Sequence, residues 1–560
     1  MRIACLFIVV FLLIPVRIWA DDGCPIHLVD WSDRSGVTFV HTDGGSGRAY
    51  LVEFMVAGLA LLDYDNDGLI DIYLLNGAPL RGTVVRQTPR NALYRNNGDG
   101  TFTDVTERAG VGDAGYGLGV VAGDYNNNGF QDLYLNNFGP NVLYRNNGDG
   151  TFTDITSQAG VDAGDLFGAG AAFLDRNGDG NLDLYVANYV DFCYDKDVSD
   201  MLRRYRFYAG PQDYQPVPDI LFGNNGDGTF SDISQSSGIA AVAGAGMGMI
   251  CFDSNNNGHT DIFICNDKGA NFLWKNDGTG RFREVGLAVG LAFDVSGSAN
   301  GSMGVDAGDF DNDGWLDLFM TDFQAEMPVL YRNLGRGVFQ DVTRRADAGR
   351  SVFPHVNWGT GLVDFDNDGW RDIFIANGHL LPEIEQLDPR TSYRLPNTLL
   401  RNRGDGRFED VSDRCGDGLA VVECSKGAAF DDLDNNGRID VVVLNANSRP
   451  TILRNQSPVD HHWIQIRLRG VTSNRDGVGA WVRVVADDLT QVAEVHSGRS
   501  YQSHYGTRLH FGLGHRDRVQ QVTVRWAGGG VDTFTDLAVD RRWVLTQGTG
   551  QPLPEKERRE

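Results

Sequence analysis

The chain is poor in positive charge and in catalytic signatures. Against 49 lysines and arginines it carries 75 aspartates and glutamates, which gives a formal net charge of −26 over 560 residues. So acidic a surface repels nucleic acid phosphates and anionic lipid headgroups. We therefore expect no nucleic acid partner, and we expect bound cations among the carboxylates.

Long hydrophobic runs are absent after the first twenty residues, so no later segment reaches the ~20 apolar residues of a membrane span. Arg2 precedes an apolar core over residues 5–16, and Ala20 offers a small residue where signal peptidase cuts. This order is typical of a secretory signal peptide. We expect cleavage near Ala20 and a secreted or periplasmic location, with an uncleaved anchor as the alternative.

Cysteines are few, and no Cys-x-x-Cys or cysteine–histidine spacing indicates zinc. An exported chain can oxidise its thiols. Cys415 and Cys424 are near enough in sequence to close a short loop. Cys251 and Cys265 flank an acidic loop and are equally well explained as two buried thiols in strands.

Enzyme motifs are also missing. The sequence has no nucleophile elbow, no P-loop and no His-Glu-x-x-His motif. Paired carboxylates are plentiful, but cation binding explains them. No catalytic residue is therefore predicted, and binding is favoured over catalysis.

What the chain has in abundance is one nine-residue pattern, Asp-x-(Asp/Asn)-x-(Asp/Asn)-Gly-x-x-Asp. It occurs seven times, with glycine at the sixth position of every copy. The copies, numbered loop 1 to loop 7, begin at Asp63, Asp124, Asp175, Asp253, Asp309, Asp364 and Asp432. Around each loop a β-type run and an Asn-Gly-Asp-Gly-type hairpin recur, which predicts units of four short strands, the size of a propeller blade.

The two ends of the repeat array indicate how it closes. The seventh unit lacks its last strand, and residues 28–37 resemble the missing piece. Sharing one blade between the first and last segments would remove an exposed sheet edge. The predicted fold class is all-β: a seven-bladed β-propeller with calcium-binding hairpin loops, followed by a small β-rich domain.

The loops have the ligand spacing of a calcium site. Oxygen ligands at positions 1, 3, 5 and 9, with a backbone carbonyl at 7, suit a hard cation. An EF-hand would need glutamate at position 12, where every loop has an apolar residue such as Leu74. A metal-free Asx-rich turn is the alternative, but four crowded carboxylates would repel one another without a cation.

We therefore predict up to seven Ca²⁺ ions. The expected ligands are Asp63, Asp65, Asp67, Leu69, Asp71; Asp124, Asn126, Asn128, Phe130, Asp132; Asp175, Asn177, Asp179, Asn181, Asp183; Asp253, Asn255, Asn257, His259, Asp261; Asp309, Asp311, Asp313, Trp315, Asp317; Asp364, Asp366, Asp368, Trp370, Asp372; and Asp432, Asp434, Asn436, Arg438, Asp440.

Two long insertions follow the strand after a loop, over residues 188–219 and 377–396, and each begins at an asparagine thirteen residues after the opening aspartate. Six asparagines and one aspartate occupy that position in the seven repeats. They predict a partner-binding surface opposite the metal loops, with Tyr205, Tyr208 and His379 in it. The alternative is that each asparagine only ends its strand in an Asx-turn.

The segment after the repeats, residues 461–547, alternates apolar and polar residues between glycine turns and predicts a small β-domain. It holds six of the eleven histidines. No pair has a helical metal-site spacing, so hydrogen-bonding or surface roles are favoured over a metal or acid–base site.

The seven loops resemble the FG-GAP (VCBS) repeats of integrin α-type propellers. Asn-Arg-Asp-Gly-Val-Gly-Ala from Asn474, and His-Phe-Gly-Leu-Gly-His from His510, look like the ASPIC and UnbV domain. This pairing is similar to that of the cartilage acidic protein-like family. The resemblance implies an exported calcium-binding protein and supplies no catalytic residues.

The expected organisation is a signal peptide at 1–20, the propeller at 26–456, the ASPIC and UnbV-like domain at 461–547 and a disordered tail at 548–560. The expected function is a binding, adhesion or scaffolding module for a protein or glycan partner. The alternatives are a propeller-scaffold polysaccharide lyase or hydrolase and a periplasmic biosynthetic accessory factor.

Overall fold

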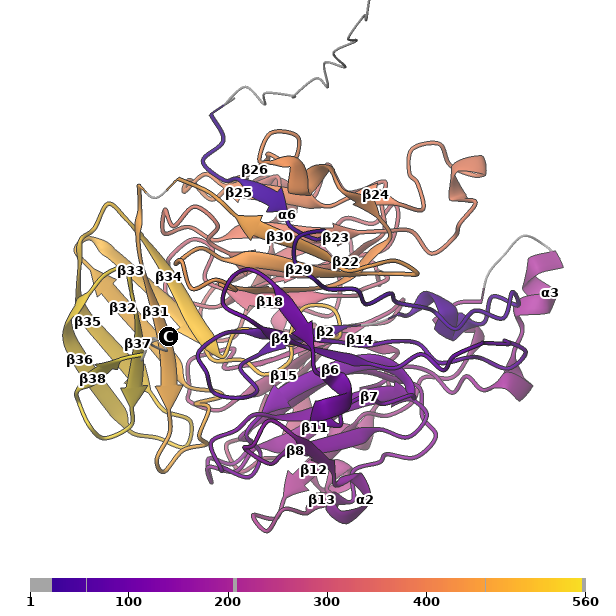
Figure 1. Ribbon diagram of the computed structural model, residues 1–560, viewed down its shortest axis with the longest axis horizontal. Coiled ribbons are helices and arrows are strands. Elements are labelled where there is room, and N and C mark those ends of the chain that lie inside the picture. The colour runs from indigo at the N-terminus through magenta and orange to yellow at the C-terminus, as the bar shows by residue number, and fades with distance from the viewer. Residues whose placement is uncertain (1–22, 57, 205–208, 459, 556–560) are drawn as a thin grey trace, which may run out of the picture.

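A computed structural model of the chain describes residues 23–56, 58–204, 209–458 and 460–555. The predicted all-β class is confirmed, because strands dominate and the helices are short (Figure 1). In these described ranges no helix is long and apolar enough to cross a membrane. The expected signal peptide lies outside the described residues.

The repeats form seven open, four-stranded antiparallel sheets. The first three are β2 (Leu59–Leu62), β3 (Asp71–Leu74), β4 (Ala92–Asn96), β5 (Phe102–Asp104); β6 (Tyr116–Gly123), β7 (Asp132–Phe138), β8 (Val142–Asn146), β9 (Phe152–Asp154); and β10 (Gly168–Leu174), β11 (Asp183–Asn188), β12 (Ile220–Asn224), β13 (Phe230–Asp232). In each sheet the loop of the repeat joins the first strand to the second.

The other four sheets repeat this order. They are β14 (Gly246–Phe252), β15 (Asp261–Asn266), β16 (Phe272–Asn276), β17 (Phe282–Glu284); β18 (Val305–Gly308), β19 (Asp317–Met320), β20 (Val329–Asn333), β21 (Phe339–Asp341); β22 (Asn357–Val363), β23 (Asp372–Asn377), β25 (Thr398–Asn402), β26 (Phe408–Asp410); and β28 (Ser425–Asp431), β29 (Asp440–Asn445), β30 (Thr451–Asn455), β1 (Leu28–Asp30).

The seventh sheet combines both ends of the array, as the sequence predicts. β1 pairs antiparallel with β30, and Leu28 lies opposite Asn455. A disulfide joins Cys24 to Cys415 beside this strand. The expectation of a short Cys415–Cys424 loop is therefore wrong, because closing the seventh sheet brings Cys24 to Cys415, and Cys424 is a buried free thiol. Cys251 and Cys265 are likewise buried free thiols, one of the two alternatives considered.

The sheets stand around a common axis with their first strands innermost. β2 neighbours β6, the series continues through β10, β14, β18 and β22 to β28, and β28 neighbours β2. We call this arrangement the ring. Its apolar core includes fully buried residues such as Leu59, Leu118 and Val442.

An asparagine at the end of each third strand, buried in all but the third sheet, joins neighbouring sheets. Asn146 donates through Nδ2 to Gln131 O in its own sheet (3.1 Å) and to Tyr64 O in the preceding one (2.8 Å). The cross-sheet bonds close on themselves, since the first sheet bonds the seventh. They run from Asn96 to Leu433, Asn146 to Tyr64, Asn224 to Tyr125, Asn276 to Arg176, Asn333 to Ser254, Asn402 to Phe310 and Asn455 to Phe365.

Short helices and turns connect the sheets. Five four-residue helices follow a fourth strand: α1 (Thr106–Ala109), α2 (Thr156–Ala159), α4 (Ser234–Ser237), α5 (Gly286–Val289) and α6 (Thr343–Ala346). The insertions and linkers contain α3 (Ser199–Arg204), η1 (Leu51–Phe54), η2 (Tyr194–Lys196), η3 (Pro211–Asp213), η4 (Ile239–Ala241), η5 (Ile384–Gln386), η6 (Asp417–Ala420), and the paired strands β24 (Leu395–Pro396) and β27 (Val422–Glu423).

The C-terminal segment forms two four-stranded sheets that share one apolar core, including Ile464, Val484 and Phe511. Their strands are β31 (His462–Arg469), β32 (Trp481–Ala486), β33 (Leu489–Glu494), β34 (Arg508–Gly514), β35 (Arg518–Arg525), β36 (Val531–Ala538), β37 (Arg541–Thr546) and β38 (Pro552–Pro554). We call this unit the tail domain. It lies on one face of the ring, and α3 lies on the other (Figure 1).

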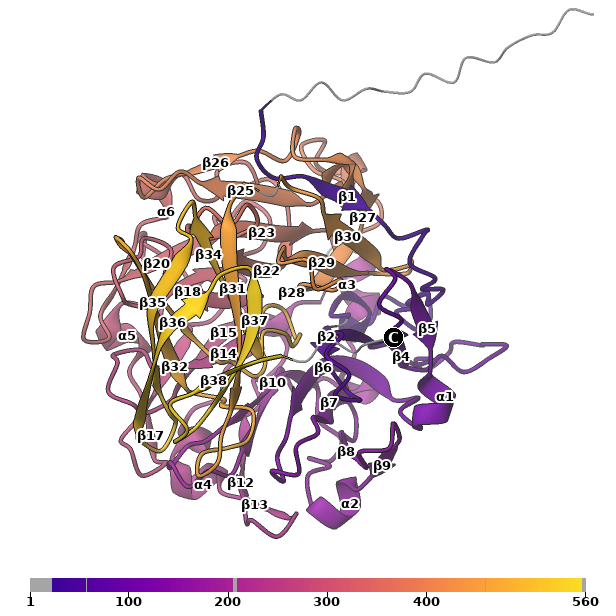
Figure 2. The ribbon, with the colours of Figure 1, turned by 60° about the vertical axis from the view of Figure 1, so that its left-hand side comes forward.

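The link between β33 and β34 enters the centre of the ring. Seen from the tail domain, the tail strands lie in front of the ring (Figure 2). The buried segment 496–506 touches all seven sheets: the contacts are His504 N to Leu59 O, Val120 N to Gln502 O, Gly498 against Ala171, His496 to Cys251 O, Ser500 N to Val305 O, Thr360 N to Ser500 Oγ and Tyr505 against Phe430. The sequence did not predict this plug.

The asparagine bonds should carry measurable stability. We expect Asn146→Ala to lower the free energy of unfolding by about 2–4 kcal/mol, because it leaves buried backbone carbonyls without donors. The neighbouring Asn147 is exposed, so Asn147→Ala should change stability by less than about 0.5 kcal/mol. Urea unfolding of both variants measures the difference, and equal effects would contradict the role assigned to Asn146.

Candidate functional site

Each loop wraps its backbone around the first aspartate. In loop 1 the Asp63 carboxylate accepts the N–H groups of Asp67 and Gly68, both at 3.0 Å. Gly68 has a φ of 85°, a conformation that glycine adopts without strain. The opening aspartates of all seven loops are buried. The loops therefore turn inward around position 1, as the sixth-position glycine predicts.

The ninth position ties the loop to the third strand. The Asp71 carboxylate accepts the N–H of Asn96 at 2.7 Å and that of Tyr64 at 3.2 Å. Asn96 is one of the seven asparagines that bond the preceding sheet. Loop geometry and ring closure therefore depend on the same buried residues.

Four loops bring three carboxylates together. In loops 1, 5, 6 and 7 the carboxylate oxygens of positions 1, 3 and 9 lie within 4.8 Å of one another. The groups are Asp63, Asp65, Asp71; Asp309, Asp311, Asp317; Asp364, Asp366, Asp372; and Asp432, Asp434, Asp440. Several aspartate clusters thus have the composition and spacing to bind a metal ion.

The third position tests whether the loops fit a cation. In loop 1, Arg95 Nε donates to Asp65 Oδ2 at 2.8 Å, whereas Asp65 Oδ1 is buried without a hydrogen-bond partner. Among the described residues, the third-position side chain of six loops has such an oxygen, on Asp65, Asn177, Asn255, Asp311, Asp366 and Asp434. Because buried acceptors are normally satisfied, these oxygens fit a hard cation held in each loop.

Burial makes these carboxylates costly to ionise without a cation. Desolvation, with like charges nearby, raises the pKa of Asp71 and Asp317 well above the usual value. It also raises the pKa of Asp309 to about 7 and, against the opposing charge of Arg467, that of Asp63 to about 6. A divalent ion would favour the charged forms.

Loops 3 and 4 differ, because a basic side chain already contacts the ninth position. Lys275 Nζ lies 2.6 Å from Asp261 Oδ2 in loop 4. Arg176 Nε lies 3.4 Å from Asp183 Oδ2 in loop 3. The third position of loops 2, 3 and 4 is asparagine. Loops 2, 3 and 4 therefore lack the third-position carboxylate that completes the compact groups of the other four loops.

The tail domain covers the loop face. Arg525 Nη2 lies 2.7 Å from Asp253 Oδ2 of loop 4, and Arg467 Nη1 lies 3.3 Å from Asp63 Oδ2 of loop 1. The Asp476 carboxylate accepts the N–H of Asp124 in loop 2 at 2.9 Å. Sequence reasoning missed this contact, although the arginines of the tail, such as Arg467 and Arg525, were a signal in so acidic a chain.

Three of the tail histidines, His461, His496 and His510, make hydrogen bonds across this interface, a role of the kind favoured from sequence. His510 Nε2 lies 2.7 Å from Asn367 Oδ1, and His496 Nδ1 lies 2.9 Å from Cys251 O. Burial lowers the pKa of His510 to about 3, so its imidazole is neutral at physiological pH.

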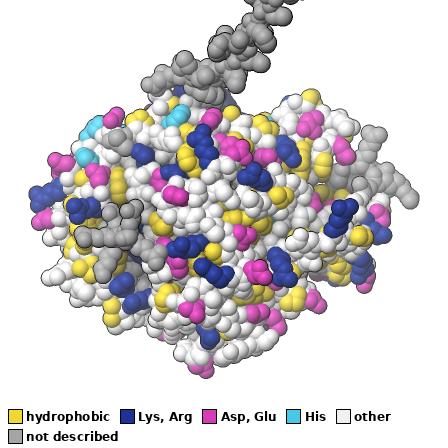
Figure 3. Space-filling model, viewed as in Figure 1, with side chains coloured by type: hydrophobic (Ala, Val, Ile, Leu, Met, Phe, Trp, Pro, Cys, Tyr) yellow, Lys and Arg dark blue, Asp and Glu magenta, His cyan; other side chains and the backbone are white. Residues whose placement is uncertain are grey.

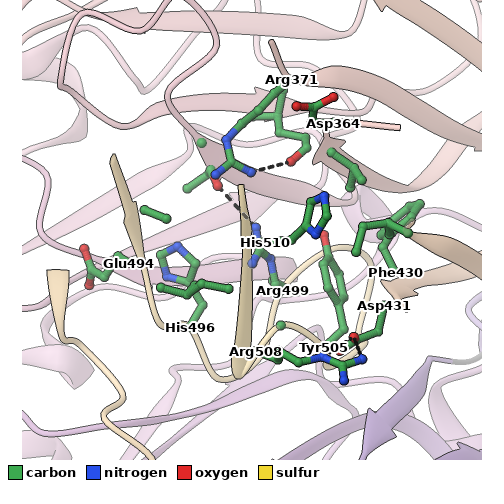
Figure 4. Close-up of a pocket in the computed structure, with 18 of the residues that line it drawn as sticks. Asp364, Arg371, Phe430, Asp431, Glu494, His496, Arg499, Tyr505, Arg508 and His510 are labelled. Atoms are coloured by element: carbon green, nitrogen blue, oxygen red, sulfur yellow. Dashed lines mark hydrogen bonds and ion pairs between the residues drawn. The ribbon is translucent and has the colours of Figure 1, made fainter. Parts of the chain in front are cut away.

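A cavity of about 60 Å³ remains between the ring and the tail domain (Figure 4). It is framed by the ion pairs of Arg499 with Asp306 and of Arg508 with Asp431. Tyr505 donates to Asp306 at 2.9 Å. These buried pairs neutralise one another and fix the plug in the ring.

The asparagines thirteen residues after each opening aspartate are buried on the opposite side of the ring and bond the residues just before the third strand of their own sheet. Asn76 Nδ2 donates to Arg90 O at 3.2 Å, its N–H donates to Asn91 Oδ1 at 2.7 Å, and its Oδ1 accepts the N–H of Thr42 at 2.8 Å. The two donor bonds recur at Asn188 and Asn377. The Asx-turn alternative is therefore wrong for these residues: an Asx-turn needs the side-chain oxygen to accept the N–H two residues on, whereas these side chains donate to residues just before the third strand, and Asn188 Oδ1 is buried without a partner.

Of the three residues predicted to bind a partner, the structure describes only His379. His379 is buried, its Nε2 lies 3.1 Å from Gln324 Oε1, and its Nδ1 accepts the N–H of Leu381 at 3.0 Å. Its side chain is therefore not part of an exposed surface. Tyr205 and Tyr208 lie outside the described residues.

We call the face of the ring opposite the calcium-type loops, where the insertions 188–219 and 377–396 lie, the insertion face. Its centre contains a pocket of about 430 Å³. Its apolar lining comes from several sheets and both insertions, and includes Phe54, Met247, Met303, Phe323, Trp358 and Leu380. The plug closes it below, where Tyr501 packs edge-on against Trp358 at 4.9 Å between ring centroids. The ring thus has one face covered by the tail domain and another with an open apolar pocket.

Comparison with known families identifies both parts. The FG-GAP-like repeat family matches residues 63–135, 124–186, 253–320, 309–375 and 364–443, and the ASPIC and UnbV family matches residues 470–552. The chain therefore belongs to the FG-GAP-like repeat family and carries an ASPIC and UnbV domain, which confirms the resemblance seen in the sequence.

Among curated relatives, cartilage acidic protein 1 of Mus musculus is 25% identical over 371 residues, covering 65% of this chain and 52% of that protein. The Homo sapiens protein is 24% identical over the same length, covering 65% and 50%. The chain thus spans about half the length of the curated relatives it matches.

Similarity to solved structures is remote. An Agrocybe aegerita lectin that recognises non-reducing terminal N-acetylglucosamine has a TM-score of 0.37 at 20% identity, covering 63% of this chain and 79% of that one. YCF48 bound to D1 peptide has a TM-score of 0.39 at 9% identity, covering 77% and 97%. Rhamnogalacturonan lyase YesW has a TM-score of 0.36 at 13% identity, covering 77% of this chain and 75% of that one.

The buried loop carboxylates predict an unusual pH dependence for metal-free protein. Burial raises the folded pKa of Asp63 to about 6 and those of Asp183 and Asp309 to about 7, above the unfolded value of about 3.9. The stability they contribute is therefore complete below about pH 4 and is lost as pH rises to about 7. Melting temperatures in EDTA should fall across this window, and a rise would contradict the assignment.

Proposed function

We propose that the chain is an exported, calcium-binding seven-bladed β-propeller that acts as a binding, adhesion or scaffolding module. Residues 26–456 form the propeller, with the seven sheets as blades, and residues 461–547 form the ASPIC and UnbV domain. The observation that carries the proposal is the division between faces: the tail domain covers the loops, and the insertions surround an open pocket.

The propeller proposal is supported by the circular pattern of neighbours. The seventh sheet contacts the first through β28 and β2. Asn96 and Leu433 join the same two sheets by a hydrogen bond of 2.7 Å. A closed ring also protects the inner edges of its sheets from pairing with other chains.

Calcium is proposed for up to seven loops. The oxygen-rich spacing, the buried oxygens without partners and the compact carboxylate groups support it. Loops 1, 5 and 6 have aspartate at all four side-chain ligand positions, so these should bind most tightly. Loops 2 and 4 have two each and should bind least tightly.

Export is proposed from the sequence of the first twenty residues and the disulfide. The Cys24–Cys415 bond joins residues 391 positions apart, and such bonds persist in oxidising compartments. Cartilage acidic protein 1 is a relative of this chain, which agrees with a role outside the cell.

The insertion face is proposed as the surface for a protein or glycan partner, of which Tyr205 and Tyr208 are part by their place in the first insertion. Loops on a rigid scaffold commonly carry binding residues. Phe54 and Phe323 are half-buried at the pocket, where aromatic side chains can act as anchors. His379 is omitted because it is buried.

Calcium should stabilise the fold. An ion that binds only the folded state adds about 2.7 kcal/mol per site at a hundredfold excess over the dissociation constant. EDTA should therefore lower the melting temperature markedly, and added Ca²⁺ should restore it. Differential scanning calorimetry with metal analysis checks this, and an unchanged melt in verified metal-free protein would refute it.

Partner binding should depend on the insertion face. Partners retained on glycan and extracellular-protein arrays in calcium buffer should bind Phe54→Ala/Phe323→Ala at least about tenfold more weakly, since loss of an anchor costs more than 1 kcal/mol. Leu287 is 71% exposed on α5, away from the pocket, and Leu287→Ala is the control. Binding that survives the double change but is lost on tail-domain changes would place the surface elsewhere.

A further inference from the structure

A groove of about 790 Å³ runs between loops 1 and 2 of the ring and the tail domain. It is lined by residues 66–68 and 128–130 of the loops and by 467–469, 475–476, 544 and 553–555 of the tail domain. It lies on the loop face, so it is separate from the pocket of the insertion face. We call it the arginine groove, after Arg467, Arg469 and Arg475 in its lining.

Three guanidinium groups crowd one wall of this groove. Arg467 and Arg469 are alternate residues of β31 and therefore lie on the same side of the strand. Arg475 follows in the turn after it. The pKa of Arg469 is lowered from its usual value, mainly by burial and further by the positive charges of Arg475 and Arg467. Like charges held this close favour an anion between them.

Two of the three arginines have no acidic partner within ion-pair distance. Across the part of the chain that the structure describes, ion pairs of 4.0 Å or less include Arg467 but neither Arg469 nor Arg475. By contrast, nearby tail arginines are paired, such as Arg508 with Asp431 and Arg525 with Asp253. Among the described residues, exposed arginines elsewhere, such as Arg344 and Arg345 on α6, also lack ion pairs, so what distinguishes Arg469 and Arg475 is that they line a groove together.

An internal carboxylate shows that an oxyanion fits beside this wall. Glu555, next to β38, places its oxygens 3.8 Å from Arg467 Nη1 and 3.5 Å from Arg542 Nη1. Glu555 Oε2 is buried and has no hydrogen-bond partner. Of the three arginines of the groove it contacts Arg467 alone, and Arg475 Nη1 donates to the backbone oxygen of Gly470 at 3.4 Å, so Arg469 and the other donors of Arg475 face no acidic side chain within 4.0 Å among the described residues.

The rest of the lining suits a ring-shaped ligand body. Phe130, at the seventh position of loop 2, is half-buried, and Leu553 is 56% exposed. Apolar side chains beside charged groups can pack against the apolar face of a sugar ring while guanidinium groups bind its acidic substituents. The volume also exceeds what a single inorganic anion fills.

Acidic side chains also line the groove, namely Asp67, Asp476 and Glu555. Asp67 is a proposed ligand in loop 1, and Asp476 contacts the opening residue of loop 2. If the two loops hold calcium, as proposed above, the ions offset these charges and leave the arginines dominant. On the face of the molecule seen in Figure 3 acidic and basic side chains are interspersed.

We propose that the arginine groove binds an acidic oligosaccharide through its carboxylate or sulfate groups. Arg469 and Arg475 hold the oxyanions by paired N–H donors, and Phe130 packs against a sugar ring. This site goes beyond the partner surface on the insertion face and is independent of it.

Calorimetric titration in calcium buffer tests the proposal with four probes: a heparin-derived hexasaccharide, hexagalacturonate, neutral maltohexaose and a phosphoserine peptide. At least one acidic saccharide should bind, and the tighter of the two identifies sulfate or carboxylate as the preferred group. Maltohexaose should not bind. Absence of binding by both acidic saccharides, or binding of the phosphopeptide alone, would overturn the proposal.

Variants separate the groove from general electrostatics. R469Q/R475Q should bind the acidic saccharide at least about tenfold more weakly, because charge-assisted hydrogen bonds to both groups are lost. R344Q/R345Q removes the same charge from exposed α6 and should bind normally. F54A/F323A, which alters the insertion face, should also bind the acidic saccharide normally. The groove and the insertion face are therefore tested independently of each other. Equal affinity of R469Q/R475Q and the native protein, both with native melting temperatures, would overturn the proposal.

Discussion

The hydrogen bond from each third-strand asparagine to the preceding sheet is the contact on which the rest of the structure depends. Asn96 fixes the ninth-position aspartate of its own loop through its N–H and bonds the adjacent sheet through its side chain. The same residue therefore sets the loop and closes the ring. A loop that loses its carboxylate geometry would also loosen the contact between two sheets.

The tail domain and the ring form a single folded unit, because the plug of the tail domain fills the centre of the ring. The plug reaches three of the sheets by backbone hydrogen bonds and the others by side-chain hydrogen bonds, a close backbone approach and a ring contact. Buried ion pairs such as Arg499 with Asp306 then hold it in place. Because pairs of this kind are costly when one partner is missing, the interface favours a permanent arrangement over a movable one.

Charge is distributed in a way that composition alone conceals. Each strongly acidic loop has an arginine from the third strand on its outer oxygens, as Arg95 has on Asp65, while the inner oxygen stays free. The acidic chain therefore keeps negative charge where a cation fits and neutralises it at the rim. Arg469 and Arg475 line a groove on the same face without a carboxylate within 4.0 Å among the described residues.

The sequence by itself determined the all-β class, the seven repeats, the loop spacing and the pairing of the first segment with the last. These follow from local rules: glycine at a positive φ, oxygen atoms at fixed offsets and alternating strands. Tertiary structure alone decided that Cys24 meets Cys415, that His379 is buried and that residues 496–506 fill the ring. These contacts join residues from different repeats, for the disulfide 391 positions apart, and they depend on how complete sheets pack rather than on any local pattern.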